Sequence, residues 1–123
     1  MIIKSCLASF LLLCSYSAMA ESEYRDPNSM DQKEYAQARE KAMLHEECMN
    51  DFSLDKIQLQ ADVRVIADHA MKECAPVLEE LYNMLVEWNY PPEFGSYYVS
   101  GISNRNASRL LSNLMRYMAM PRQ

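Results

Sequence analysis

The sequence predicts an all-α protein, a small antiparallel bundle of three helices (four if the chain breaks at Pro76) pinned by one disulfide bond. Glycine and proline are scarce, with two and five among 123 residues, and long segments contain neither. Apolar residues recur at alternating spacings of three and four, which is typical of amphipathic helices. Beyond the first twenty residues the chain has two cysteines, which are expected to pair with each other.

Residues 1–20 have the three parts of a secretory signal peptide. Lys4 supplies the positive charge near the start, an apolar segment follows, and Ala18-Met19-Ala20 matches the small-x-small pattern before a cleavage site. The apolar segment is about ten residues long, whereas a membrane-spanning helix needs about 20. We therefore expect cleavage after Ala20 and a periplasmic or secreted protein.

Cleavage leaves 103 residues, enough for one domain with a modest core. Residues 21–28 are polar, and we expect them to be a flexible lead-in. Residues 29–123 are expected to form a single helical domain. The chain after cleavage carries 11 basic and 17 acidic residues, a net charge of −6. An acidic exported protein is not expected to bind nucleic acid.

The first helix is predicted to begin after Ser29, an N-cap residue that Gln32 completes as a capping box. No glycine or proline follows as far as Phe52, where we place the end of this helix. Its apolar face is predicted to consist of Tyr35, Ala38, Ala42, His45, Met49 and Phe52.

The second helix is predicted from a stripe that keeps its phase from Val63 to Trp88. Pro76 lies inside this stripe and is expected to kink or break the helix, because proline lacks a backbone donor and clashes with the preceding turn. Pro91 and Pro92 mark its end. The stripe comprises Val63, Ala67, Ala70, Cys74, Val77, Leu81, Met84 and Trp88.

A loop with two glycines is predicted next, and a third helix is predicted from a cap at Ser103 to about Met120. One side of this helix is apolar, and three arginines gather on the opposite side. The apolar residues are Leu110, Leu111, Leu114, Met115 and Met118, and the arginines are Arg105, Arg109 and Arg116.

Cys48 and Cys74 are predicted to form a disulfide bond, because Cys6 and Cys14 leave with the signal peptide. One alternative is that the cysteines stay free or pair between chains. Another is a metal site, since a histidine precedes each cysteine in HEEC and HAMKEC. His69 and Cys74 are five residues apart, however, which separates them by about 140° on a helix. No bound metal or cofactor is expected.

A disulfide requires the two α carbons to lie within about 7 Å. A second helix that started directly after Phe52 would not satisfy this requirement in a straight hairpin. Residues 57–65 alternate between apolar and polar, which is typical of an extended chain. We therefore predict that residues 53–60 are extended or irregular and that the second helix begins near Ala61.

The protein is not expected to be an enzyme, because no Gly-x-Ser-x-Gly motif occurs and two glycines are too few for a phosphate loop. His45 is expected to be a partly buried histidine bonded to a backbone carbonyl or a tyrosine. Two enzymatic or metal-based alternatives remain open. One is a hydrolase that groups His45 with Glu46 or Asp51, and the other is a periplasmic metal-handling protein that uses His45 and methionines.

The aromatic segment WNYPPEFGSYYV is the predicted recognition surface, because binding residues concentrate in loops and tyrosine is frequent at binding hot spots. Its members are Tyr90, Phe94, Tyr97 and Tyr98. A lid folded over the core is the equally weighted alternative. The arginines at 105, 109 and 116 are also predicted partner contacts. A slightly preferred alternative is that the third helix packs against the acidic remainder of the chain, which attracts its arginines. Contact of the third helix with a membrane surface is not favoured.

No motif identifies a family. The layout of a signal peptide, about a hundred helical residues and one cysteine pair is similar to that of small periplasmic inhibitors and immunity proteins that block secreted cell-wall enzymes. The leading hypothesis is a small exported, non-enzymatic binding protein, inhibitor-like or immunity-like, whose partner is an unknown periplasmic protein.

Overall fold

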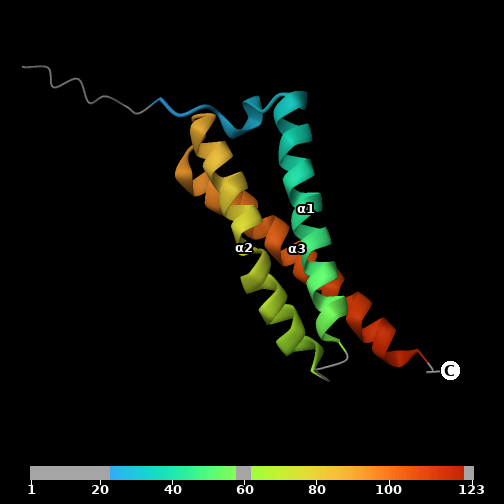
Figure 1. Cartoon of the computed structure of the whole chain (residues 1–123). Helices are drawn as coiled ribbons and strands as arrows, with labels where there is room; N and C mark the ends of the chain where they lie inside the picture. Colours follow the sequence, from blue (N-terminus) through green and yellow to red (C-terminus); the bar gives the residue numbers. More distant parts are fainter. Residues whose placement is uncertain (1–22, 58–61, 121–123) are drawn as a thin grey trace, which may run out of the picture.

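The computed structural model describes residues 23–57 and 62–120. The predicted signal peptide lies outside the described residues. The described chain forms three long helices, α1 (Gln32–Lys56), α2 (Val63–Glu87) and α3 (Pro92–Ala119), after a short 3-10 helix, η1 (Pro27–Ser29) (Figure 1). The predicted all-α bundle with one disulfide is confirmed.

Helices α1 and α2 form an antiparallel pair, and α3 returns across both of them in the direction of α1 (Figure 1). Hydrogen bonds from α3 to the middle of α1 join Asn106 to Ala42 and Arg109 to Glu46. Because later residues of α3 meet later residues of α1, the two helices run parallel. Among the described residues, no helix has the length and apolar character needed to cross a membrane.

Helix α1 begins at a capping box built from Asp31 and Glu34, and the predicted cap at Ser29 is wrong. Asp31 accepts a hydrogen bond from the Glu34 amide at 2.8 Å, which satisfies one of the free donors of the first turn. The Ser29 hydroxyl instead donates to the Asp26 carbonyl inside η1. The helix also ends at Lys56, later than the expected end at Phe52.

The predicted bond between Cys48 and Cys74 joins α1 to α2, with their α carbons 5.9 Å apart. The expected irregular segment is wrong for residues 53–56, which continue α1, and residues 58–60 lie outside the described residues. At 1.5 Å per residue, Cys48 lies about 12 Å before the end of α1 and Cys74 about 17 Å after the start of α2. A late turn between the helices therefore lets a simple hairpin bring the cysteines together.

Helix α2 is continuous through Pro76, so the described residues form three long helices and the alternative of a fourth helix after a break does not occur. Pro76 is exposed, which places its missing backbone donor on the water side of the helix. The helix starts at Val63 after an Asp62 cap, close to the start expected near Ala61.

Helix α3 begins at Pro92, so the predicted glycine-bearing loop and the cap at Ser103 are wrong. Proline is well suited to the first helical position, where no backbone donor is needed. Gly95 is buried where α3 meets α2, and a side-chain carbon added to it would lie 3.1 Å from the Tyr82 ring. This glycine permits a close helix contact and does not mark a loop. The connecting turn contains Asn89 with φ of 67°, a conformation that asparagine tolerates.

The core has two apolar clusters separated by a polar pair, His45 and Asn106. One cluster surrounds the disulfide, and the other lies toward the α2–α3 turn. The first contains Met49, Ile57, Ile66, Ala67, Ala70, Cys74, Leu110 and Leu114. The second contains Met30, Ala38, Leu78, Leu81, Leu85, Tyr90 and Ile102.

Removal of the disulfide is expected to destabilise the protein. The two cysteines are 26 positions apart, and closing a loop of this length restricts the unfolded chain by about 3–4 kcal/mol on the chain-entropy model. We expect a Cys48→Ala/Cys74→Ala double variant to lose this amount in urea unfolding followed by circular dichroism. An unchanged free energy of unfolding would contradict the expected stabilisation.

Replacement of Ser53 by alanine is expected to stabilise the protein. Ser53 is 1% exposed, and its hydroxyl has no hydrogen-bond partner among the described residues. An unpaired buried hydroxyl costs about 1–3 kcal/mol, and alanine also has the higher helix propensity. We expect Ser53→Ala to raise the free energy of unfolding by about 1 kcal/mol. Destabilisation would show that the hydroxyl has a partner in solution.

Candidate functional site

The four aromatic residues expected in a recognition loop are not equivalent in the structure. Tyr97 is 81% exposed, whereas Tyr90 is fully buried. Phe94 and Tyr98 are half-buried on the first turns of α3. Tyr97 and Tyr98 are therefore the aromatic residues of the predicted surface with side chains accessible to a partner on these turns, and Tyr90 belongs to the core.

Tyr90, Phe94 and Tyr98 form an aromatic row along the start of α3. The ring centroids of Tyr90 and Phe94 are 5.4 Å apart, and those of Phe94 and Tyr98 are 5.7 Å apart. These distances and the tilted rings are typical of favourable aromatic pairs. The row connects the buried Tyr90 to Tyr98, which reaches the surface between α3 and α1.

A groove of about 480 Å³ runs between α1 and the first half of α3, and Tyr98 forms part of its wall. Tyr35 and Arg39 line it from α1, opposite Arg105 from α3. The remaining lining residues are Gln32, Ala36, Ala42 and Ile102. The groove thus combines two aromatic hydroxyls, two guanidinium groups and a floor of small apolar side chains.

The groove is electrostatically positive at both walls. Arg39 and Arg105 are exposed, and the ion pairs of residues 23–57 and 62–120 involve neither of them. Partial burial raises the pKa of Tyr98, and the neighbouring Tyr35 adds to this effect while Arg105 opposes it. The Tyr98 hydroxyl is therefore protonated and able to donate to an anionic group held by the arginines.

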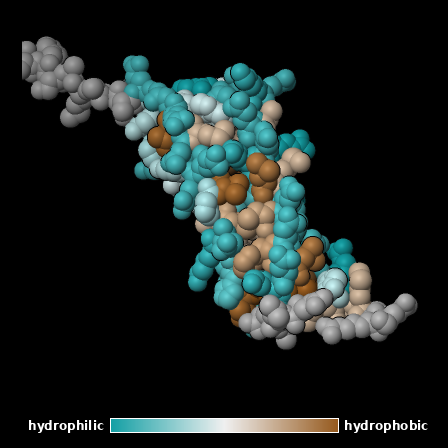
Figure 2. Space-filling model, in the orientation of Figure 1, coloured by the Kyte–Doolittle hydropathy of each residue, from teal (hydrophilic) through white to brown (hydrophobic). Residues whose placement is uncertain are grey.

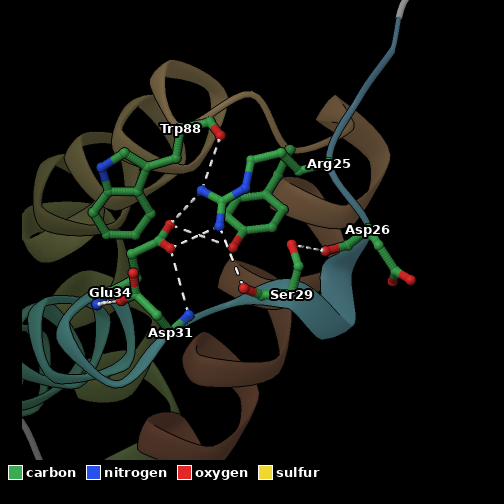
Figure 3. Close-up of polar contacts among 7 residues, drawn as sticks. Arg25, Asp26, Ser29, Asp31, Glu34 and Trp88 are labelled. Atoms are coloured by element: carbon green, nitrogen blue, oxygen red, sulfur yellow. Dashed lines mark hydrogen bonds and ion pairs between the residues drawn. The ribbon is translucent and has the colours of Figure 1, made fainter.

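A polar cluster around Arg25 and Glu34 holds the upper end of α1 in place (Figure 3). The Arg25 guanidinium donates to both Glu34 carboxylate oxygens at 2.8 Å, a bidentate geometry that strengthens the pair. It also donates to the Trp88 carbonyl at 3.3 Å and lies 4.6 Å from the centroid of the Tyr90 ring. The Tyr90 hydroxyl donates to the same carboxylate at 3.3 Å.

Residues 21–28 are expected to be a flexible lead-in, but their described part, residues 23–28, makes specific contacts with the rest of the protein. The Arg25 amide donates to the Asn89 carbonyl at 2.8 Å, and the Asn89 side chain donates to the Glu23 carbonyl at 2.7 Å. The Arg25 hydrogen bond is the main cause that lowers the pKa of Glu34. Residues 23–31 therefore belong to the folded unit and support the turn that precedes α3.

The three arginines predicted as one stripe have different environments. Arg105 lines the groove, Arg109 donates to Glu46 on α1 at 3.2 Å, and Arg116 lies exposed on the last turns of α3. The structure therefore brings only Arg105 together with the predicted aromatic surface.

His45 lies at the centre of the bundle, 1% exposed, and its Nδ1 is 2.9 Å from the Asn106 side-chain nitrogen. That nitrogen also donates to the Ala42 carbonyl at 3.2 Å, which fixes the orientation of the amide because a carbonyl only accepts. Nδ1 of His45 is then an acceptor, and the imidazole is neutral with its proton on Nε2. Burial lowers the pKa of His45, in agreement with this protonation state, while nearby Glu46 opposes the shift.

The histidine-based alternatives obtain no support from this geometry. The Nδ1 atom of His45 is occupied by Asn106, and Glu46 is engaged by Arg109. Within residues 23–57 and 62–120, no three histidine, cysteine or acidic side chains lie close enough to share a metal ion.

Sequence reasoning missed Tyr35 and Arg39 as members of the groove. Tyr35 was assigned to the core face of the first helix, but it is 52% exposed. The available signal was the spacing of Tyr35 and Arg39 by four residues and of Tyr98 and Arg105 by seven, which places each pair on one helix face. These two faces meet only because α3 runs parallel to α1 and packs beside it. Local periodicity in the sequence does not specify this direction.

No family model matches the sequence, and neither the curated proteins nor the solved structures contain a significant match.

The stability of the protein is expected to fall in two steps that begin at different pH values as the pH is lowered. His45 has a pKa below its ordinary 6.5, so the unfolded chain binds a proton first and stability declines as the pH falls below 6.5. Glu34 has a pKa below its ordinary 4.5, so its contribution is complete above 4.5 and is lost as the pH falls through the lower folded value.

A His45→Gln variant separates the two steps, because glutamine offers an acceptor to Asn106 and does not titrate. We expect urea unfolding of this variant to show a smaller pH dependence than the natural protein between pH 6.5 and pH 4.5, with the lower step retained. An identical slope in both proteins would show that His45 is not the titrating group.

Proposed function

We propose that this chain is an exported, non-enzymatic binding protein that holds an acidic segment of a partner protein in the groove between α1 and α3. The single observation that carries the proposal is the lining of that groove by Tyr35, Arg39, Tyr98 and Arg105. Its setting in a disulfide-linked bundle favours a preformed site, because a rigid scaffold reduces the entropy lost on binding.

The residue types favour a protein partner with carboxylates. Tyrosine and arginine are enriched at binding hot spots, because each combines a large contact area with directional hydrogen bonds. Arg39 and Arg105 present guanidinium groups that suit bidentate contacts with carboxylates. The apolar floor at Ala42 and Ile102 accommodates an aliphatic side chain beside the acidic groups.

The length of the groove favours an extended peptide segment. From Gln32 to Ala42 the lining of α1 spans ten residue steps, or about 15 Å of helix. An extended segment of about four or five residues covers this distance. Tyr97, at 81% exposed, lies beside Tyr98 on α3 and supplies additional contact area at the same end of the molecule.

An inhibitor-like or immunity-like role is the form of binding that we favour. Such proteins act by occupying a surface of a secreted enzyme and need no chemistry of their own. A surface loop of that enzyme with two carboxylates and one aliphatic residue would match the groove.

Reversal of the groove charge is expected to abolish partner capture. The natural protein and an Arg39→Glu/Arg105→Glu variant would be immobilised, exposed to periplasmic extract of the source cells, and compared by quantitative mass spectrometry. We expect the partner to be depleted about tenfold or more with the variant, because arginine hot spots often contribute more than 1.4 kcal/mol. Candidate partners would then be purified and their affinities measured by calorimetry.

The matched control is Arg64→Glu/Lys72→Glu, which makes the same charge change at exposed positions of α2 outside the groove. Far-ultraviolet circular dichroism of all three proteins checks that the fold is retained. A partner that is captured equally by the groove variant and the control contradicts the proposal, since binding would then take place elsewhere.

A further inference from the structure

The last turns of α3 form an apolar surface that the rest of the described chain does not cover. Met115, Tyr117, Met118 and Met120 are 56%, 49%, 39% and 59% exposed. They point to different sides of the helix, with Arg116 as the charged residue among them, and α3 runs past the end of α1 at this point (Figure 1). Hydrophobic side chains also reach the surface at this end of the molecule in Figure 2. A helix segment that is apolar all round is normally buried.

A second groove, of about 310 Å³, lies directly beside this helix end. Leu54 and Ile57 line it from α1, and Leu110, Leu114 and Tyr117 line it from α3. The polar lining residues are Asn50, Ser53 and Asn113. Leu54 is 58% exposed, so the apolar wall of the groove continues onto the surface.

We propose that a second copy of this chain covers this end of the molecule, with the α3 end of each copy seated against the groove of the other. The groove and the projecting methionines belong to one surface patch. A two-fold contact needs such a patch, because each copy must offer both the inserted group and its receptor. Buried apolar area at the centre of the contact supplies the stabilisation.

The charges at this end are complementary between two copies. Arg116 lies among the exposed residues of α3, and Asp51 and Asp55 are exposed at the end of α1, on either side of Leu54 in the sequence. In a reciprocal contact, Arg116 of each copy faces the acidic pair of the other. The same asymmetry holds for the whole chain, since residues 94–123 contain four arginines and no acidic residue whereas all 17 acidic residues precede them.

A lipid surface is the competing occupant, and the charges disfavour it. Arg116 is the one basic residue between Leu110 and Met120, and the exposed Lys56 at the end of α1 is adjacent to Asp55, whereas helices that lie on anionic membranes carry several basic residues. The rest of the chain is strongly acidic and would be repelled by an anionic bilayer. A second copy, in contrast, places the carboxylates of Asp51 and Asp55 opposite Arg116 and an apolar groove beside them.

The test is sedimentation velocity of the disulfide-bonded protein over a range of concentrations. We expect a monomer–dimer equilibrium that Tyr117→Glu weakens about tenfold or more, since the change places a charge in the apolar contact. Tyr97→Glu is the matched control, because Tyr97 lies on the same helix, is 81% exposed and is distant from the α3 end. Circular dichroism confirms that both variants remain folded.

A charge exchange tests the reciprocal pairing directly. Arg116→Glu alone and Asp51→Lys/Asp55→Lys alone should each weaken the homodimer, because like charges then face each other. A mixture of the two variants should recover dimerisation, since every facing pair in the mixed dimer has opposite signs.

Three outcomes would overturn the inference. The first is a protein that stays monomeric at its highest soluble concentration. The second is a dimer that Tyr117→Glu or the charge variants leave unchanged, or whose charge variants do not recover on mixing. The third is a monomer that binds vesicles of anionic phospholipid through Tyr117, which would assign this end of α3 to a lipid surface.

Discussion

The disulfide between Cys48 and Cys74 sets the register on which the other contacts between α1 and α2 depend. In an antiparallel pair, positions equally far from a fixed link face each other. Glu34 lies 14 residues before Cys48 and Trp88 lies 14 residues after Cys74, and Arg25 bridges this pair through the Glu34 carboxylate and the Trp88 carbonyl. The bond near one end of the hairpin and the Arg25 cluster at the other therefore belong to a single register.

A second register, between α1 and α3, is set by polar groups inside the bundle. Asn106 bonds both His45 and the Ala42 carbonyl, and Arg109 bonds Glu46 one turn further on. These contacts separate the residue numbers by 61 to 64, and the two tyrosines of the groove, Tyr35 and Tyr98, are separated by 63. The alignment of α1 and α3 that gives the buried His45 imidazole its hydrogen bond therefore also places the two walls of the groove opposite each other. A buried polar pair restricts sliding of the helices, because an unpaired amide or imidazole in the core is costly.

The sequence was informative where local periodicity decides the structure, and uninformative where distant segments meet. The stripes around Met49 and Cys74 predict two helices and their buried faces, and the expected export of the chain favours the disulfide. The expected irregular segment at residues 53–56 is wrong because the first helix is predicted to end at Phe52, and the disulfide distance is then met by an extended segment. A hairpin bridged at Cys48 and Cys74 also meets this distance when the first helix continues further, as it does to Lys56. Gly95 was read as a loop residue because only the approach of Tyr82 reveals its role in a helix. The Arg25 cluster joins three sequence regions and had no local pattern.

The groove and the apolar end of α3 lie far apart on the same helix, which determines how the two proposals combine. From Tyr98 to Met115 there are 17 residue steps, or about 26 Å of helix. In the proposed dimer, a second copy seated at the end of α3 would leave the groove of each copy open. A dimer of this kind has two sites for the acidic segment. Binding to a partner that is itself dimeric, or that carries two such segments, would then be strengthened by effective concentration and not by any new contact. Helix α3 thus carries Arg105 in the proposed binding groove and Arg116 at the proposed association surface, so one helix supplies an arginine to each.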